Sequence, residues 1–202
     1  MITIIDYGMG NLGSIKNMLK KIGVQSMITS EIADINQAEK IILPGVGVFD
    51  KAMQNLNDLG IVDLIRERAL QDKIPMLGIC LGMQLLGNKS EEGSLDGLRL
   101  IPGDIRRFDL PSNLKVPHMG WNDVEITQDS ILFHETLEIP RYYFVHTYYF
   151  DCIDESHVVG KSSYGTLFTS VIQNGNIWGT QFHPEKSHKY GMKLLKNFVE
   201  LS

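Results

Sequence analysis

IPMLGICLGMQLL, residues 74–86, places an apolar strand, a cysteine between two glycines and a helix in direct succession. A turn of the form Gly-x-nucleophile-x-Gly bends the chain so sharply between strand and helix that the flanking residues must be small. It holds the middle side chain at the carboxyl end of the strand, where open α/β sheets bind their ligands. The stretch therefore predicts an α/β fold with Cys80 as a candidate nucleophile. A buried structural cysteine is the alternative.

The chain before this turn alternates between apolar runs and helical patterns. Residues 2–6, 24–29, 40–43 and 74–79 are typical of buried strands, and each is followed by turn residues or a helix. Residues 11–22 and 49–69 carry apolar side chains at helical spacing, with a break near Gly60. Such alternation predicts parallel strands joined by crossover helices.

The pattern changes beyond Gly97. Short alternating segments at 141–149, 157–163, 168–173 and 177–182 are separated by turn residues such as Asn174-Gly175. They predict an antiparallel or mixed extension of the sheet, and a last amphipathic helix is expected over 188–201. We expect one domain, residues 1–202, with a mixed, largely parallel central sheet flanked by helices.

Composition narrows the functional classes. Of the 202 residues, 43% are hydrophobic and 21% charged, which is the composition of a globular protein rather than a disordered one. The 19 Lys+Arg and 24 Asp+Glu give a net charge of −5, without the basic excess that nucleic acids or anionic membranes require. No signal sequence or membrane-spanning run is visible, and the two cysteines form no disulfide framework. A cytoplasmic protein with reduced thiols is expected.

A cysteine nucleophile needs a base, and the base needs an orienting group. His183 ends an alternating segment within TQFHPE, residues 180–185, and Glu185 follows closely enough for its carboxylate to hold one imidazole nitrogen. The other nitrogen would then face Cys80. A strand end with solvated side chains is the alternative for this segment taken alone.

Two backbone N–H groups are candidates for an oxyanion hole. The N–H of Leu81 lies at the start of the helix after Cys80. The glycines of PGVG, residues 44–47, allow a peptide at Val46 or Gly47 to turn a second N–H into the cleft. A plain tight turn is the alternative.

Residues 75–86, followed by His183-Pro184-Glu185, resemble the class I, triad-type glutamine amidotransferases over nearly the whole chain. The resemblance implies a flavodoxin-like mixed α/β sheet and hydrolysis of the side-chain amide of L-glutamine through a glutamyl thioester. It implies that Cys80 is the nucleophile, His183 the general acid and base, and Glu185 the residue that orients His183. No cluster of residues in the sequence has the spacing of metal ligands, and no cofactor is implied.

The resemblance also implies a glutamine pocket. Gly47, Gln84, Glu92, Thr147 and Tyr148 fall where the family contacts its substrate. Glu92 is expected to recognise the α-amino group through an ion pair. Without the resemblance, Glu92 would be interpreted as an acidic residue on a solvated turn.

Further segments narrow the resemblance within the family. DYGMGNL (6–12), PHMGWN (117–122), FVHTY (144–148) and HPEKS (183–187) are similar to glutaminase subunits that form a heterodimer with a (β/α)8-barrel cyclase in histidine biosynthesis. This implies a partner-facing surface at the cleft mouth, made by Asn11, Trp121, Asn122, His146 and Lys186. Ammonia released into water would become ammonium, which is not nucleophilic, so a sealed interface with a separate acceptor protein is expected. From the residues alone, Trp121 could be a core aromatic and Lys186 a plain surface charge.

Other functions remain open. TYYF (147–150) and SHKYG (187–191) are similar to amidotransferase subunits that supply ammonia for sugar amination in surface-polysaccharide synthesis. A catalytically silent structural or redox relative and a cysteine peptidase of related fold belong to other classes. The intact Cys80, His183 and Glu185 argue against a silent relative, and the Trp121-Asn122 and Lys186-Ser187 segments are not needed by a peptidase.

Overall fold

The computed structural model describes residues 1–136 and 138–202. Its α-helices are α1 Leu12–Lys21, α2 Ile32–Asn36, α3 Phe49–Asp58, α4 Val62–Leu70, α5 Leu81–Leu85 and α6 His188–Leu201. Its strands are β1 Ile2–Ile5, β2 Ser26–Thr29, β3 Lys40–Gly45, β4 Met76–Cys80, β5 Gly103–Arg107, β6 His118–Asp123, β7 Glu125–Ile126, β8 Arg141–His146, β9 Tyr148–Cys152, β10 Val158–Tyr164, β11 Thr166–Asn174 and β12 Ile177–Thr180. Within these ranges, no helix is long and apolar enough to cross a membrane.

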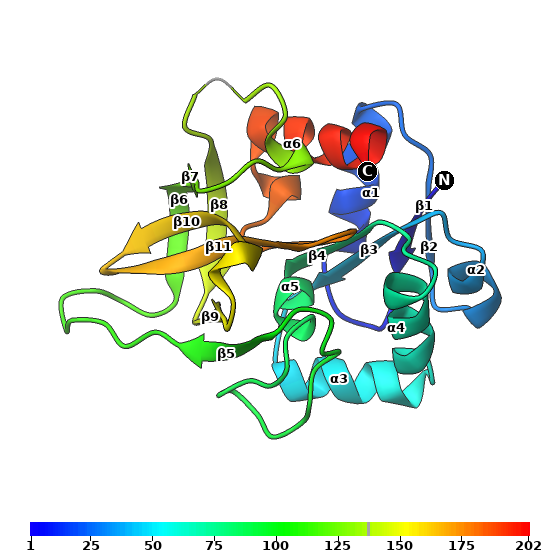
Figure 1. Cartoon of the computed structure of the whole chain (residues 1–202), viewed down its shortest axis with the longest axis horizontal. Helices are drawn as coiled ribbons and strands as arrows, with labels where there is room; N and C mark the ends of the chain where they lie inside the picture. The colour runs from blue at the N-terminus through cyan, green and yellow to red at the C-terminus, as the bar shows by residue number, and fades with distance from the viewer. Residues whose placement is uncertain (137) are drawn as a thin grey trace.

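The central sheet has the strand order β2-β1-β3-β4-β12-β11-β10-β7 (Figure 1). The strands from β2 to β12 are parallel, and β11, β10 and β7 continue the sheet in antiparallel fashion. The parallel strands are almost entirely apolar because helices cover both of their faces. A mixed, largely parallel sheet flanked by helices was predicted, and this prediction is confirmed.

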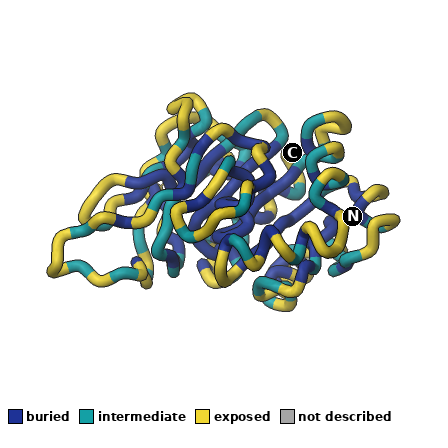
Figure 2. The backbone as a smooth tube through the Cα atoms, turned by 90° about the horizontal axis from the view of Figure 1, so that it is seen from below, coloured by how far each residue is buried: buried dark blue, intermediate teal, exposed yellow. Residues whose placement is uncertain are grey.

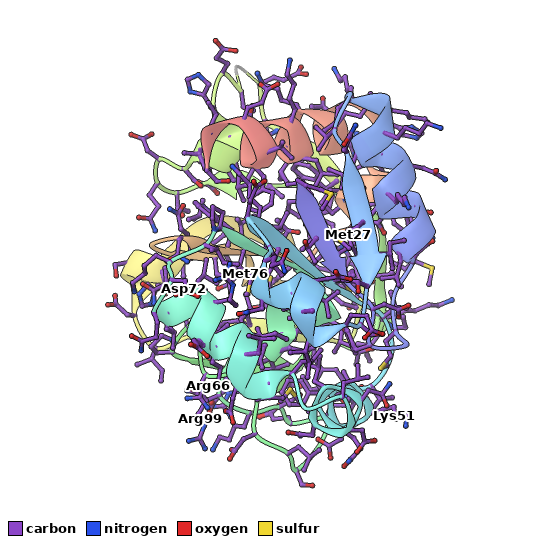
Figure 3. All side chains as sticks on the ribbon, turned by 90° about the vertical axis from the view of Figure 1, so that its right-hand side faces the viewer. Met27, Lys51, Arg66, Asp72, Met76 and Arg99 are labelled. Atoms are coloured by element: carbon purple, nitrogen blue, oxygen red, sulfur yellow. The ribbon has the colours of Figure 1, made fainter. Side chains whose placement is uncertain are left out.

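Two helical layers enclose the parallel strands. Side chains of α3, α4 and α5 pack on one face with Ile41 and Leu43, whereas α1 and α6 pack on the other face with Ile42. Figure 3 shows this arrangement from the side, with Met27 of β2 and Met76 of β4 between the helices. The buried strands run through the middle of the molecule and the exposed segments lie outside them (Figure 2). The alternation of side chains along each strand thus builds two separate hydrophobic layers.

The second half of the chain differs in detail from the prediction. The alternating segment 141–149 is divided at Thr147 into β8, which pairs with β6 in a separate two-stranded sheet, and β9, which pairs with β5 and β11. The strands β5 and β6 and the short helix α2 were not predicted. The final helix was predicted over 188–201, as observed.

The carboxyl ends of β3, β4 and β12 meet at one edge of the sheet. Gly45 is the neighbour of Cys80 in the parallel register, and Thr180 is the neighbour of Ile79. This edge therefore gathers the PGVG segment, the cysteine turn and the start of the segment that leads to His183.

The turn at Cys80 depends on the absence of two side chains. A Cβ at Gly78 would lie 2.7 Å from the carbonyl oxygen of Gly82, and a Cβ at Gly82 would lie 1.8 Å from the carbonyl oxygen of Leu43. Helix α5 consequently rests directly on the backbone of β3 and β4. A larger residue at either position would push the helix off the sheet.

Gly82→Ala tests this contact. Because the new methyl group meets the backbone of β3, we expect the variant to lose about 3 kcal/mol of unfolding free energy or more, measured by urea denaturation. Gly13→Ala is the matched control, since nothing lies within 4 Å of the Cβ added in α1. The control should be unchanged or up to about 1 kcal/mol more stable. Equal stability of the two variants would contradict the proposed close contact.

Candidate active site

Cys80 occupies a strained turn at the end of β4. Its φ of 55° and ψ of −110° lie outside the regions that L-residues normally adopt. The residue is 6% exposed, and Leu81 begins helix α5 directly after it. The strain fixes the sulfur at the sheet edge and turns the first backbone N–H groups of the helix toward the same space.

His183 and Glu185 form a buried pair next to this turn. The Nδ1 atom of His183 lies 2.9 Å from Oε1 of Glu185, and both side chains are 2% exposed. The N–H of His183 donates to the carbonyl oxygen of Tyr143, and the hydroxyl of Ser187 donates to the carbonyl oxygen of His183. Backbone contacts on both sides thus set the direction of the imidazole, as a carboxylate-oriented base requires.

The remaining nitrogen of His183 is available for chemistry. Its Nε2 is buried and makes no hydrogen bond of normal geometry with the described residues. Burial lowers the pKa of His183, but interactions with Cys80 and the Glu185 carboxylate outweigh burial and raise that pKa to about 10. His183 is therefore protonated at neutral pH and can donate a proton toward Cys80 or a bound group.

Gln181 is a polar neighbour of the cysteine that the sequence analysis did not assign to the site. Its side chain is fully buried, its Nε2 lies 3.9 Å from Sγ of Cys80, and its Oε1 accepts from Nε2 of Gln84. Gln181 precedes His183 by two residues at the end of β12. Strand alternation could have placed Gln181 and His183 on the same side, but nothing in the sequence indicates what Gln181 contacts.

A cavity of about 280 Å³ opens beside Cys80. It is lined by residues from five separate segments of the chain: Val46, Gly47, Cys80, Leu81, Gln84, Glu92, Pro117, Val145, His146, Thr147 and Tyr148. All the residues that were predicted to bind substrate or an oxyanion therefore face one space. Another hollow, about 420 Å³, lies beside α6 with Lys189 and Lys193 in its wall, and it contains none of these residues.

The carboxylate of Glu92 is held at the start of α3. Its Oε2 accepts from the backbone N–H of Phe49 at 2.8 Å, the first residue of that helix. Asp50 fixes the following loop by accepting from the backbone N–H groups of Ser94 and Leu95. The hydrogen bonds from Ser94 hold the pKa of Asp50 below its ordinary value, so this anchor is ionised at neutral pH. The carboxylate of Glu92 is thus held in a defined place in the cavity wall.

The PGVG segment lies beside Cys80 in a conformation that only glycine adopts easily. Gly47 has a φ of 121°, and a Cβ there would lie 2.5 Å from Cε of Met9. The Tyr7 hydroxyl donates to the carbonyl oxygen of Pro44 at 2.6 Å. The segment is therefore held against residues 7–9 on one side and opens to the cavity on the other.

The predicted partner-facing residues divide into two groups. Asn11, Trp121 and Lys186 are exposed, and Asn122 is half-buried. Trp121 stacks on His188 with 5.5 Å between ring centroids, and Nζ of Lys186 lies 5.8 Å from the ring of Tyr143. Asn11 also has a local role, because its side chain caps helix α1.

His146 corrects the sequence-based prediction. It was assigned to the partner-facing surface, but it is only 6% exposed and its ring nitrogens bond to His118 and to the carbonyl oxygen of Tyr148. The strand β8 alternates between buried and half-buried side chains, and His146 falls on the buried side. It lines the cavity from below the surface.

The family described as "Glutamine amidotransferase class-I" matches residues 3–201. "Imidazole glycerol phosphate synthase subunit HisH 2" of Methanococcus maripaludis is 51% identical over 99% of both chains, and the subunit of the same name from Pseudomonas aeruginosa is 47% identical over 100% of both. "Imidazole glycerol phosphate synthase subunit HisH" of Oceanobacillus iheyensis is 48% identical over 100% of this chain and 99% of its own.

Solved structures share the fold at low sequence identity. A structure titled "Crystal structure of glutamine amidotransferase" has a TM-score of 0.76 at 19% identity, and the match covers 100% of this chain and 98% of the other. "Structure of PurLQS from Thermotoga maritima" has a TM-score of 0.73 at 19% identity, covering 98% and 96%. The architecture of these proteins is therefore the architecture of this chain.

The buried pair gives a pH-dependent stability. Because folding raises the pKa of His183 from 6.5 to about 10, its contribution to stability is complete below pH 6.5 and is lost as the pH rises to 10. Glu185→Gln removes one cause of this shift. We expect the unfolding free energies of wild type and Glu185→Gln to differ most near pH 6.5 and to converge as the pH rises toward 10.

Glu91→Gln is the control for this experiment. Glu91 is an exposed carboxylate paired with Arg106, and its pKa is lowered by hydrogen bonds from Arg107 and Arg106. Its effect on urea denaturation should stay constant over the same pH range. A constant difference for Glu185→Gln as well would mean that His183 is already neutral at the lower pH.

Proposed function

Because the chain belongs to the class-I glutamine amidotransferase family, we propose that it is the glutaminase subunit of imidazole glycerol phosphate synthase in histidine biosynthesis. It hydrolyses glutamine to glutamate and ammonia. The observation that carries this proposal is the single cavity that joins Cys80 to Gly47, Gln84 and Glu92, with the His183–Glu185 pair beside the cysteine.

Substrate binding uses the charge distribution of the cavity. The α-ammonium group of glutamine pairs with the carboxylate of Glu92, which Phe49 holds in place. The side chain of glutamine extends past Gln84 and Thr147 toward Cys80. This orientation places the amide carbon beside the sulfur, and the proximity supplies part of the rate enhancement.

The first half of the reaction forms a thioester. The Cys80 thiolate attacks the amide carbon, and the oxygen that becomes negative receives hydrogen bonds from the N–H of Leu81 and from that of Val46 or Gly47. Protonated His183 donates its proton to the amide nitrogen, the carbon–nitrogen bond breaks, and ammonia leaves. His183 is then neutral, and Glu185 continues to orient it.

The second half regenerates the enzyme. Neutral His183 takes a proton from water, and the resulting hydroxide attacks the thioester carbon. The carbon–sulfur bond breaks, Cys80 leaves as thiolate, and the glutamic acid loses its carboxyl proton to solvent. The thiolate and the protonated imidazole are then ready for the next glutamine.

The name of the relatives, a subunit of a synthase, implies a partner chain. We propose that the partner is the cyclase subunit, a (β/α)8 barrel, in a heterodimer that forms in the cytoplasm. Asn11, Trp121, Asn122 and Lys186 around the cleft mouth form the proposed docking surface. A closed interface keeps ammonia out of water, where protonation would remove its nucleophilicity.

One observation favours a second candidate for the protein that accepts the ammonia, a sugar-aminating partner. His188 belongs to the segment 187–191 that is similar to sugar-amination subunits, and it stacks on Trp121 within the proposed docking surface. The partner-facing side therefore carries a feature of both kinds of subunit. The glutaminase chemistry is the same in either case, and only the identity of the acceptor differs.

Removal of the nucleophile tests the chemistry. Cys80→Ala should abolish glutamate release from glutamine, because no other group can form the thioester. Glu185→Ala should keep residual activity with kcat lowered by about 10²–10⁴, since it removes only the orientation of His183. Cys152→Ala is the matched control, as the pKa of this thiol is raised to about 12 by burial and nearby carboxylates. Wild-type turnover by Cys80→Ala would refute the mechanism.

The acceptor is tested by adding partners. We expect slow glutamate release by the chain alone and an increase of about 5- to 150-fold when a histidine-pathway cyclase and its phosphoribulosyl substrate are added. Trp121→Ala should weaken docking by about 2 kcal/mol, whereas Leu201→Ala, an exposed apolar residue at the far end of α6, should not. A competent glutaminase that ignores this partner would instead be assigned to sugar amination.

A further inference from the structure

The side chains of Asn122, His118 and His146 and the backbone carbonyl of Tyr148 form a chain of hydrogen bonds that runs from strand β6 to the cavity. Nδ2 of Asn122 lies 3.3 Å from Nε2 of His118, and Nδ1 of His118 lies 2.9 Å from Nε2 of His146. Nδ1 of His146 lies 2.8 Å from the carbonyl oxygen of Tyr148. The chain therefore connects a residue at the proposed docking surface to the wall of the glutamine pocket.

Backbone groups fix the direction of this chain at its outer end. The Nδ2 group of Asn122 also donates to the carbonyl oxygen of Ser163, and its Oδ1 accepts from the N–H of Asp123. A carbonyl oxygen can only accept and an N–H can only donate, so the amide of Asn122 has one possible orientation. Its Nδ2 must therefore donate to Nε2 of His118.

The hydrogen bond at the inner end of the chain, between His146 and Tyr148, independently gives the same donor-to-acceptor direction. The carbonyl oxygen of Tyr148 can only accept, so Nδ1 of His146 carries the proton. Nε2 of neutral His146 is then an acceptor, and Nδ1 of His118 must be the donor. Each imidazole has a single N–H in a defined position, and every link of the chain is satisfied.

Burial keeps both rings in this state. His118 is 3% exposed and His146 is 6% exposed. Burial lowers the pKa of His118 to about 4 and that of His146 to about 3, so neither ring is charged at neutral pH. The ring of His118 stacks on Tyr164 with 4.2 Å between centroids, and Phe108 and Phe144 also pack against the pair.

The carbonyl oxygen of Tyr148 links this chain of hydrogen bonds to the side chain of Gln84. Nε2 of Gln84 donates to that oxygen at 3.0 Å and to Oε1 of Gln181 at 3.1 Å. Both N–H groups of the Gln84 amide are thereby engaged, and its Oε1 is the atom that remains for a ligand in the cavity. An acceptor oxygen attracts the N–H groups of glutamine and repels the carboxylate of glutamate.

We propose that His118 and His146 are positioning residues for glutamine, which hold the Tyr148 carbonyl so that Gln84 presents its oxygen to the substrate. The proposal rests on the proposed glutaminase function and assigns the origin of its amide selectivity. Because His118 does not line the cavity, it acts only through His146, and its substitution reports on the chain alone.

Substitution of each histidine by asparagine or by glutamine distinguishes the role of its Nδ1 atom from that of its Nε2 atom. An asparagine amide reaches the place of Nδ1, and a glutamine amide reaches the place of Nε2. His146→Asn therefore keeps a donor for Tyr148, whereas His146→Gln loses it and keeps the link to His118. His118→Asn likewise keeps a donor for His146, whereas His118→Gln loses it and keeps the link to Asn122.

The measurement is the Kd of L-glutamine by calorimetry, with each variant made in a Cys80→Ala background that cannot turn the ligand over. We expect His146→Gln and His118→Gln to weaken binding by about tenfold, the effect of one buried hydrogen bond, and the two asparagine variants to change it by less than about threefold. With Cys80 intact, His146→Gln and His118→Gln should raise the KM for L-glutamine and leave kcat within about threefold of the wild-type value.

Tyr164→Phe is the control for packing. It keeps the ring that stacks on His118 and removes only the hydroxyl that donates to the carbonyl oxygen of Lys115. Its Kd should equal that of the parent. Thermal unfolding of every variant distinguishes loss of structure from loss of binding. If a His146 variant does not fold, the comparison of His118→Gln with His118→Asn tests the proposal instead.

The outcomes distinguish this proposal from the proposed function. Suppose that the parent, Cys80→Ala, still binds L-glutamine, and that the His→Gln and His→Asn variants bind it with equal Kd values. This result would overturn the positioning role of His118 and His146 and leave the proposed glutaminase function intact. A parent that does not bind glutamine would overturn the proposed function and this proposal with it.

Discussion

The direct contact between helix α5 and the backbone of β3 and β4 is the constraint on which the site depends. It exists because Gly78 and Gly82 have no side chains, and it forces Cys80 to a positive φ. The five-residue helix α5 then carries the proposed nucleophile Cys80 at its start, the proposed oxyanion donor Leu81 and, one turn later, the proposed substrate contact Gln84. Their relative positions are consequences of one close approach, so they cannot drift independently.

Several polar side chains of the site are buried, and hydrogen bonds offset the free-energy cost of removing them from water. The His183–Glu185 pair is enclosed, and contacts of the His183 backbone with Tyr143 and Ser187 keep it ordered. On the opposite wall, Asp50 ties the Glu92 loop to the start of α3, where the helix dipole also favours negative charge. The polar groups of the cavity are thus held in place by several separate elements before any ligand binds.

Sequence reasoning succeeded where the signal is local. The apolar runs of β1, β3 and β4 and the helical spacing of α1 and α6 identify these elements because each pattern reflects burial of its own segment. The two-stranded sheet β6–β8 was missed because its pairing joins segments far apart in the chain. His146, Gln181 and His118 were misplaced or overlooked for the same reason, since their roles come from contacts that no short window of sequence contains.

The burial of Cys80 also decides which oxidants can reach it. Cys80 is 6% exposed and lines a cavity of about 280 Å³, whose wall also includes Glu92. A small neutral peroxide fits such a space, whereas a bulky, negatively charged disulfide such as oxidised glutathione does not. Because a small peroxide oxidises a thiol to sulfenic acid, the size of the cavity favours this product over a mixed disulfide at Cys80.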